Sequence, residues 1–123
     1  MNRTWLLLAA LGGFSGVALG AFAAHGLKAT LTPEYLAVFQ TGVHYQMLHS
    51  LALLALAALA PQLGRLGDWA GRGFVAGIVL FSGSLYLLTL TATPKLGMVT
   101  PIGGLALLAG WACLFAAGWR YRR

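Results

Sequence analysis

Residues 5–24 read WLLLAALGGFSGVALGAFAA and contain no Asp, Glu, Lys or Arg. A transmembrane helix needs about 20 consecutive apolar residues, so this stretch is long enough to cross a bilayer. Three further uncharged stretches follow at residues 43–60, 73–92 and 101–119. Of all residues, 59% are hydrophobic and 8% are charged, against about 25% charged in soluble domains. The sequence therefore predicts an all-α membrane protein, a bundle of four transmembrane helices that forms a single domain over residues 1–123.

The positive charges predict how this bundle is oriented. One predicted side of the membrane carries Arg3, Arg65, Arg72, Arg120, Arg122 and Arg123, whereas the other carries only Lys28 and Lys95. Cytoplasmic loops are enriched in Lys and Arg, so both termini and the loop 61–72 are expected in the cytoplasm of a bacterium, with the protein in the inner membrane. The segment 25–42 and the turn 93–98 are then outside. Because the cations sit at helix ends, the net charge of +6 indicates no nucleic-acid partner.

Small residues predict where the helices approach one another. Gly12, Gly16 and Gly20 recur every fourth residue, a spacing that lets two membrane helices pack closely. The complete set of glycines assigned to helix packing is Gly12, Gly16, Gly20, Gly42, Gly73, Gly77, Gly83, Gly103, Gly104 and Gly110.

Proline positions predict helix boundaries. Thr32-Pro33 and Thr100-Pro101 have the order of an N-cap followed by a first-turn proline, while Pro61 and Pro94 are expected to end the second and third helices.

The second predicted helix is longer than the bilayer requires. From residue 33 to residue 60 it would extend roughly 42 Å, against a hydrocarbon core of about 30 Å. We therefore expect its outer end to lie along the membrane interface, with a bend at Gly42.

Polar side chains gather near the outer ends of the first two predicted helices, at His25, Gln40, His44, Tyr45, Gln46, His49 and Ser50. Three- and four-residue spacings place Gly42, Gln46, His49 and Ser50 on one helix face. Exposing that face to lipid would cost several kcal/mol, so we expect it to face the bundle interior.

The histidines admit two interpretations. Each is either neutral and hydrogen-bonded between helices, or part of a site for haem, metal or a lipophilic molecule such as a quinone. His44 lies roughly 140° around the helix from His49, so His25 and His49 form the more plausible ligand pair. The sequence contains no established metal or haem motif and assigns no cofactor.

Catalytic groups are scarce in this chain. Glu34 and Asp68 are its only acidic residues and lie in separate connecting segments. If these segments lie on opposite sides of the membrane, paired-carboxylate chemistry within one chain is excluded. Neither Ser82 nor Ser84 sits in a G-x-S-x-G turn that would expose a nucleophile. We expect that the protein is not an enzyme.

Four motifs in order, at residues 20–25, 41–49, 80–86 and 100–104, make the chain resemble the domain of unknown function 423 family. This resemblance covers nearly the whole chain and implies a small four-span bacterial inner-membrane protein, with animal relatives of which some are mitochondrial. It supplies no established reaction, ligand or partner. It places emphasis on His25, Gly42, Tyr45, Gln46, His49, Ser82, Gly83, Ser84, Tyr86, Pro101, Gly103 and Gly104.

Three functions remain open from the sequence. The first is a non-enzymatic accessory or scaffolding subunit that binds lipid, a membrane-protein partner or a second copy of itself. The second is a binding protein for haem, metal or a small lipophilic molecule, and the third is a small channel or exporter. The residues expected to contact a ligand or partner are His25, Tyr45, Gln46, His49, Ser82, Ser84 and Tyr86.

Overall fold

All regular secondary structure is helical in the part of the chain that the computed structural model describes, residues 1–121. The helices are α1 (Arg3–His25), α2 (Pro33–Gly77), α3 (Gly83–Thr91) and α4 (Thr100–Arg120). Two 3₁₀ helices, η1 (Leu27–Ala29) and η3 (Pro94–Met98), lie in the connections, and the π-helical segment η2 (Ile78–Ser82) joins α2 to α3. Arg122 and Arg123, two of the predicted cytoplasmic cations, lie outside the described residues.

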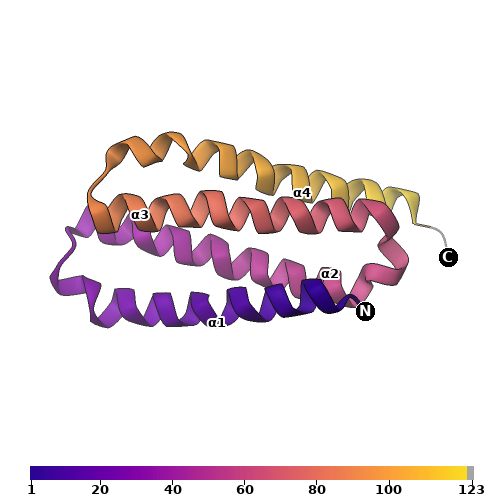
Figure 1. The fold of residues 1–123 in the computed structure, drawn as a ribbon, viewed down its shortest axis with the longest axis horizontal. Coiled ribbons are helices and arrows are strands. Elements are labelled where there is room, and N and C mark those ends of the chain that lie inside the picture. The colour runs from indigo at the N-terminus through magenta and orange to yellow at the C-terminus, as the bar shows by residue number, and fades with distance from the viewer. Residues whose placement is uncertain (122–123) are drawn as a thin grey trace.

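Helix α2 reverses direction at Gly64. This glycine has φ 62° and ψ −145°, whereas helical geometry holds on both sides of it, so α2 consists of a first limb (residues 33–63) and a second limb (residues 65–77). The second limb continues through η2 into α3 and runs back alongside the first (Figure 1). Residues with a Cβ rarely adopt this backbone conformation, which explains why a glycine occupies the turn.

Replacing Gly64 with alanine is expected to lower the free energy of unfolding by about 1–2 kcal/mol, because the new Cβ strains the reversal. The added Cβ meets nothing within 4 Å, so the backbone is the only source of this cost. Unfolding by SDS in mixed micelles measures the effect. Gly13→Ala is the matched control, because Gly13 is helical and equally open. Equal stability of the two variants would contradict the prediction.

Three helical segments are long and apolar enough to cross a membrane: Arg3–Ala29, Pro33–Thr91 and Pro94–Arg120. The sequence predicts four separate spans, and the structure has three such segments, so the prediction of four separate spans is not confirmed. The predicted second and third spans belong to one helical segment of 59 residues, which is interrupted at Gly64. Their predicted connection, residues 61–72, is helical apart from Gly64.

The expectation that Pro61 ends the second helix is wrong. Pro61 lies inside α2, and the helix continues to Gly64. A proline has no backbone N–H, so it leaves the carbonyl four residues earlier, on Ala57, without its helical donor. The backbone N–H of Asn2 donates to this carbonyl at 2.9 Å and so replaces the missing bond. The start of α1 thereby compensates for the proline in α2.

The predicted boundary at Thr32 is confirmed, because its hydroxyl accepts a hydrogen bond from the Tyr35 N–H at 3.2 Å. The predicted bend at Gly42 is wrong, since α2 keeps helical geometry there. A Cβ at Gly42 would lie 2.8 Å from Cε1 of Tyr86, so this glycine permits a close contact rather than a bend. Thr100 is likewise not the N-cap of α4: Val99 holds that position, without a side-chain hydrogen bond.

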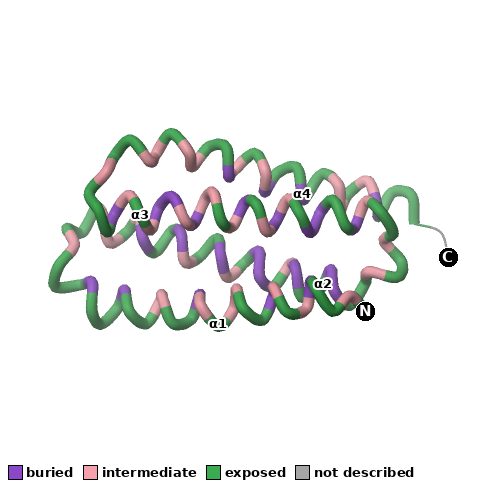
Figure 2. Tube along the Cα trace, viewed as in Figure 1, coloured by how far each residue is buried: buried purple, intermediate pink, exposed green. Residues whose placement is uncertain are grey.

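Buried residues are concentrated along α2, while α1 and α4 are largely exposed on their outer faces (Figure 2). The larger hydrophobic core includes Trp5 of α1, Phe74 of the second limb and Leu107 of α4. A smaller core at the other end contains Ala23, Leu27 and Phe39. Helix α2 therefore forms the centre against which the other helices pack.

Most of the glycines assigned to packing lie where helices meet. Gly12, Gly16 and Gly20 of α1 face Ser50, Met47 and Val43 of the first limb, in that order. Gly73 and Gly77 face Ala106, Leu107 and Gly110 of α4, while Gly103 and Gly110 face Phe81 and Phe74. Two members of the set make no such approach. A Cβ at Gly83 would meet nothing within 4 Å, and one at Gly104 would come no nearer than 3.9 Å to Phe81.

Candidate functional site

Gln46 joins three helices through its side-chain amide. Its Nε2 donates to the backbone oxygen of Gly12 at 2.9 Å and to the hydroxyl of Ser15 at 2.8 Å, both on α1. Its Oε1 accepts a hydrogen bond from the hydroxyl of Tyr86, on α3, at 2.6 Å. Gln46 is 5% exposed, so water does not compete strongly for these bonds. The amide uses its donors and its acceptor to hold α1, α2 and α3 together.

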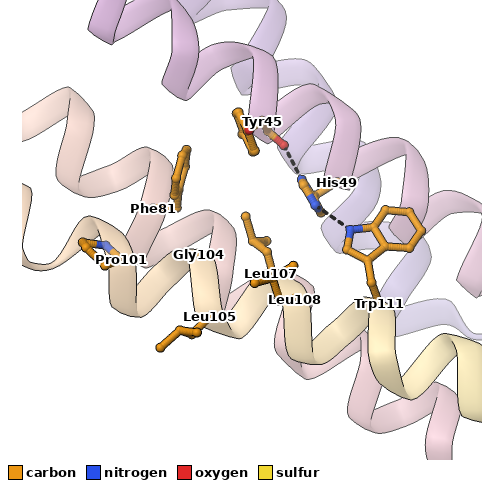
Figure 3. A pocket seen from close by; sticks show the side chains of 9 residues that line it. All are labelled: Tyr45, His49, Phe81, Pro101, Gly104, Leu105, Leu107, Leu108 and Trp111. Atoms are coloured by element: carbon orange, nitrogen blue, oxygen red, sulfur yellow. Dashed lines mark hydrogen bonds between the residues drawn. The ribbon is translucent and has the colours of Figure 1, made fainter.

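His49 joins the first limb of α2 to α4. Its Nε2 accepts a hydrogen bond from the indole N–H of Trp111 at 3.0 Å, and its Nδ1 lies 2.8 Å from the backbone oxygen of Tyr45. An indole N–H can only donate, so Nε2 is unprotonated and a neutral His49 donates to Tyr45 through Nδ1. Both ring nitrogens are therefore occupied by partners within the protein (Figure 3).

Ser82 and Ser84 connect the third rod of the fold, which consists of the second limb, η2 and α3, to its two neighbours. The hydroxyl of Ser82 donates to the backbone oxygen of Gly42 on α2 at 2.6 Å. The hydroxyl of Ser84 lies 2.6 Å from that of Thr100, at the start of α4. Neither serine contacts a histidine that could serve as a base, since each has its hydrogen-bond partner elsewhere.

The structure does not bring His25 and His49 together. Gly12 faces Ser50 and Gly20 faces Val43, so α1 and the first limb are antiparallel and His49 lies near the level of Gly13. His25 is then roughly 18 Å further along α1, at about 1.5 Å per residue. His25 is also exposed, at the last residue of its helix. Within residues 1–121, no group of three or more His, Cys, Asp or Glu side chains could hold a metal ion.

The predicted interior face of the second helix is buried as expected. Gly42, Gln46, His49 and Ser50 are all buried, and Ser50 donates to the backbone oxygen of Gln46 at 2.7 Å. Tyr45, in contrast, is 38% exposed and packs its ring against Phe81 with 4.5 Å between centroids.

An open groove of about 560 Å³ runs beside His49 between α2, η2 and α4. Its lining consists of Tyr45, His49, Phe81, Pro101, Gly104, Leu105, Leu107, Leu108 and Trp111 (Figure 3). A second open groove of about 360 Å³ lies between α1 and the third rod, with Gln46, Ser15 and Tyr86 among its lining residues. Both grooves combine apolar walls with a few polar side chains, as sites for lipophilic molecules do.

Sequence reasoning missed three participants in these contacts. Ser15 was not singled out, although it lies three residues after Gly12 and so next to the stripe that faces α2. Trp111 and Thr100 were assigned no contact with the polar cluster, yet each supplies a bond to it. Both residues are far in sequence from the residues they bond, so no local pattern indicates these contacts.

Replacing His49 with alanine is expected to lower the free energy of unfolding by about 2 kcal/mol, because the Trp111 N–H loses its acceptor and the buried imidazole leaves a cavity. His25→Ala is the matched control, and we expect a change below about 0.5 kcal/mol at this exposed position. SDS titration of both variants measures the difference. Equal effects would contradict a structural role for His49.

Comparisons with known proteins identify relatives of similar length. The family model described as "Protein of unknown function (DUF423)" matches residues 19–104. A Bacillus subtilis protein named UPF0382 membrane protein YwdK is 42% identical, over 97% of this chain and 98% of its own length. The Escherichia coli UPF0382 inner membrane protein YgdD is also 42% identical, over 99% of this chain and 94% of its own length. A Haemophilus influenzae UPF0382 membrane protein is 45% identical, over 93% of this chain and 92% of its own length. No solved structure matches the chain.

The membrane location follows from two findings. The relatives are named membrane or inner-membrane proteins, and three helical segments of this chain are long and apolar enough to span a bilayer. The protein is thus a multi-pass protein of the bacterial inner membrane. With a family model that covers most of the sequence and relatives aligned over nearly all of it, the chain belongs to the DUF423 family, whose function is unknown.

Proposed function

We propose that the protein is a non-enzymatic accessory or scaffolding subunit that binds a membrane-protein partner. In this proposal the chain crosses the membrane four times with both termini in the cytoplasm. Support for this comes from the reversal of α2 at Gly64 and from the packing of residues 65–91 beside α4 and of the first limb beside α1. The observation that carries the proposal is the state of the interior polar groups. Among the described residues, no buried side-chain nitrogen or oxygen lacks a hydrogen-bond partner. Groups that hold helices together are not free to act on a substrate.

The outer faces of α1 and α4 supply the contact surface in this proposal. Phe14 on α1 is 79% exposed and Phe115 on α4 is 71% exposed. In a bilayer, apolar faces of this kind contact either lipid tails or the helices of another protein. We place the partner there because the buried polar side chains are already hydrogen-bonded within the protein.

Photocrosslinking from the native membrane tests this proposal. A photoreactive amino acid at position 14 or 115 of chromosomally expressed protein is expected to give one defined protein adduct. The same amino acid at buried position 39 is the control and should give no such adduct. Adducts with lipid alone at both exposed positions, together with purification in mild detergent without any other protein, would refute the partner role.

A second candidate function is the binding of a small lipophilic molecule in the groove beside His49. The aromatic rings of Tyr45, Phe81 and Trp111 line this groove and would stack against a flat ring. Haem or metal ligation by His49 requires that its Nε2 first release the Trp111 N–H.

Organic extraction and absorption spectroscopy of the purified protein test this second candidate. A stoichiometric molecule should be present in wild type and absent from Leu108→Trp, which fills the groove with a larger side chain. Leu7→Trp is the control, since Leu7 is similarly exposed but lines no part of this groove. An empty wild-type protein, or equal retention in both variants, would exclude the candidate.

A further inference from the structure

Two arginines from distant parts of the chain line one pocket at the end of the molecule where α2 reverses. The pocket has a volume of about 260 Å³ and includes Gln62 and Arg65, on either side of Gly64, and Arg120 and Tyr121, at the end of α4. Because Gly64 turns the chain through a conformation that favours glycine, it places residues 62 and 65 beside the last turn of α4. The pocket therefore depends on the reversal of α2.

No acidic side chain neutralises this pocket. The sequence contains two carboxylate side chains, Glu34 and Asp68, and neither lines it. Glu34 lies in the first turn of α2, at the other end of the first limb, and Asp68 accepts a hydrogen bond from the indole of Trp5 at 3.3 Å. Two guanidinium groups that share a pocket repel each other unless an anion lies between them. The side chains of this protein do not supply that anion.

An apolar groove adjoins the basic pocket through Arg120. This groove, of about 320 Å³, is lined by Phe115, Ala116, Trp119 and Arg120. The rings of Phe115 and Trp119 stack with centroids 6.2 Å apart, and Trp119 is 81% exposed. Tryptophan beside arginine at a helix end is typical of the level of the lipid headgroups. Arg120 is thus shared by a polar pocket at headgroup level and an apolar groove along the last turns of α4.

We propose that this pocket binds the phosphate of an anionic phospholipid, with an acyl chain in the groove along α4. Arg65 and Arg120 contact the phosphate oxygens, and arginine is suited to this because its guanidinium can donate two parallel hydrogen bonds. The Gln62 amide and the Tyr121 hydroxyl add neutral donors. A free phosphate ion would occupy the pocket but leave the groove empty. The presence of both features favours a lipid as the source of the phosphate. The groove includes Phe115, one of the two photocrosslinking positions, whereas Phe14 on α1 and the polar cluster around Gln46 lie outside this site.

Native mass spectrometry of the full-length protein with defined lipids tests the proposal. Phosphatidylglycerol is expected to bind more tightly than phosphatidylcholine of the same acyl composition. Arg65→Gln together with Arg120→Gln should weaken phosphatidylglycerol binding about 30-fold. This value assumes that each arginine contributes the binding free energy typical of a basic residue at an anionic membrane surface. Lys28→Gln together with Lys95→Gln removes the same charge from the connections at the opposite end and should leave binding unchanged.

Two further experiments distinguish a lipid from free phosphate and control for misfolding of the double variant. Inorganic phosphate in millimolar excess should not displace phosphatidylglycerol; displacement would mean that the pocket binds free phosphate only. Equal binding of the two lipids, or undiminished binding in the Arg65/Arg120 variant, would overturn the proposal. If that double variant loses its helical circular-dichroism signal, each single variant should still show a loss of about fivefold. A partner protein crosslinked from position 14, which lies outside the groove, leaves this result unaffected, and so does the absence of such a partner.

Discussion

Replacing Gly103 with alanine is expected to lower the free energy of unfolding by about 3 kcal/mol, the largest effect predicted for a single added methyl group in this chain. A Cβ on Gly103 would lie 2.7 Å from the Cα of Phe81 and 2.8 Å from the carbonyl carbon of Leu80. Both are backbone atoms, so no side chain can rotate away and α4 must separate from η2. That movement would also stretch the hydrogen bond between Ser84 and Thr100.

Gly118→Ala in the same helix is the matched control, because a Cβ there would meet nothing within 4 Å. Alanine favours helix over glycine by about 1 kcal/mol, so this control should be unchanged or slightly more stable than wild type. The measurement is the SDS fraction at which each variant unfolds in mixed micelles. A Gly103→Ala protein as stable as wild type would mean that α4 does not approach η2 this closely in the membrane.

Replacing Gln46 with leucine is expected to lower the free energy of unfolding by about 2 kcal/mol. The substitution keeps the side-chain volume similar but leaves the part-buried hydroxyl of Tyr86 without its acceptor and the contact to α1 without its donor. An unpaired buried polar group costs about 1–3 kcal/mol, and bonds between membrane helices lie towards the lower end of this range. Gln40→Leu, at an exposed position of the same helix, is the control and should have little effect.

A double-mutant cycle separates the bond from the rest of the substitution. Tyr86→Phe removes the same hydrogen bond from its other side, so it should cost little more once Gln46 is leucine. Additive effects of the two substitutions would show that the Tyr86–Gln46 bond contributes nothing, and would leave Gln46 as a contact to α1 alone.

The sequence predicted those features that depend on neighbouring residues. The N-cap of α2 at Thr32 follows from a local capping pattern. The burial of Gln46 and His49 follows from helical spacing and the cost of polar groups in lipid. The glycines of α1 pack against another helix, as their four-residue spacing indicates, although spacing alone could not identify the first limb of α2 as the partner.

The wrong predictions concern residues whose role is decided by a distant segment. Pro61 remains helical because Asn2 supplies a hydrogen bond to Ala57, and nothing near Pro61 indicates this. Gly42 packs against Tyr86, 44 residues later, and the local sequence predicts a bend there because it gives no sign of this contact.

The pairing of His25 with His49 failed for the same reason. The register between α1 and α2, which no local pattern determines, places the two residues at different depths. His49 instead pairs with Trp111 on α4.

The π-helical segment η2 bears on how relatives of this chain should be aligned. A π turn holds one residue more than an α turn, and such segments occur as single-turn insertions within otherwise regular helices. In a homologue with one residue fewer at this point, a regular α-helical turn would replace the π turn. The second limb and α3 would then present the same faces to the helices they pack against. A single-residue gap between these helices therefore belongs at residues 78–82, where Val79 is 64% exposed, rather than in a connecting turn. Evolution can shorten this helix by one residue without rotating Ser84 away from Thr100.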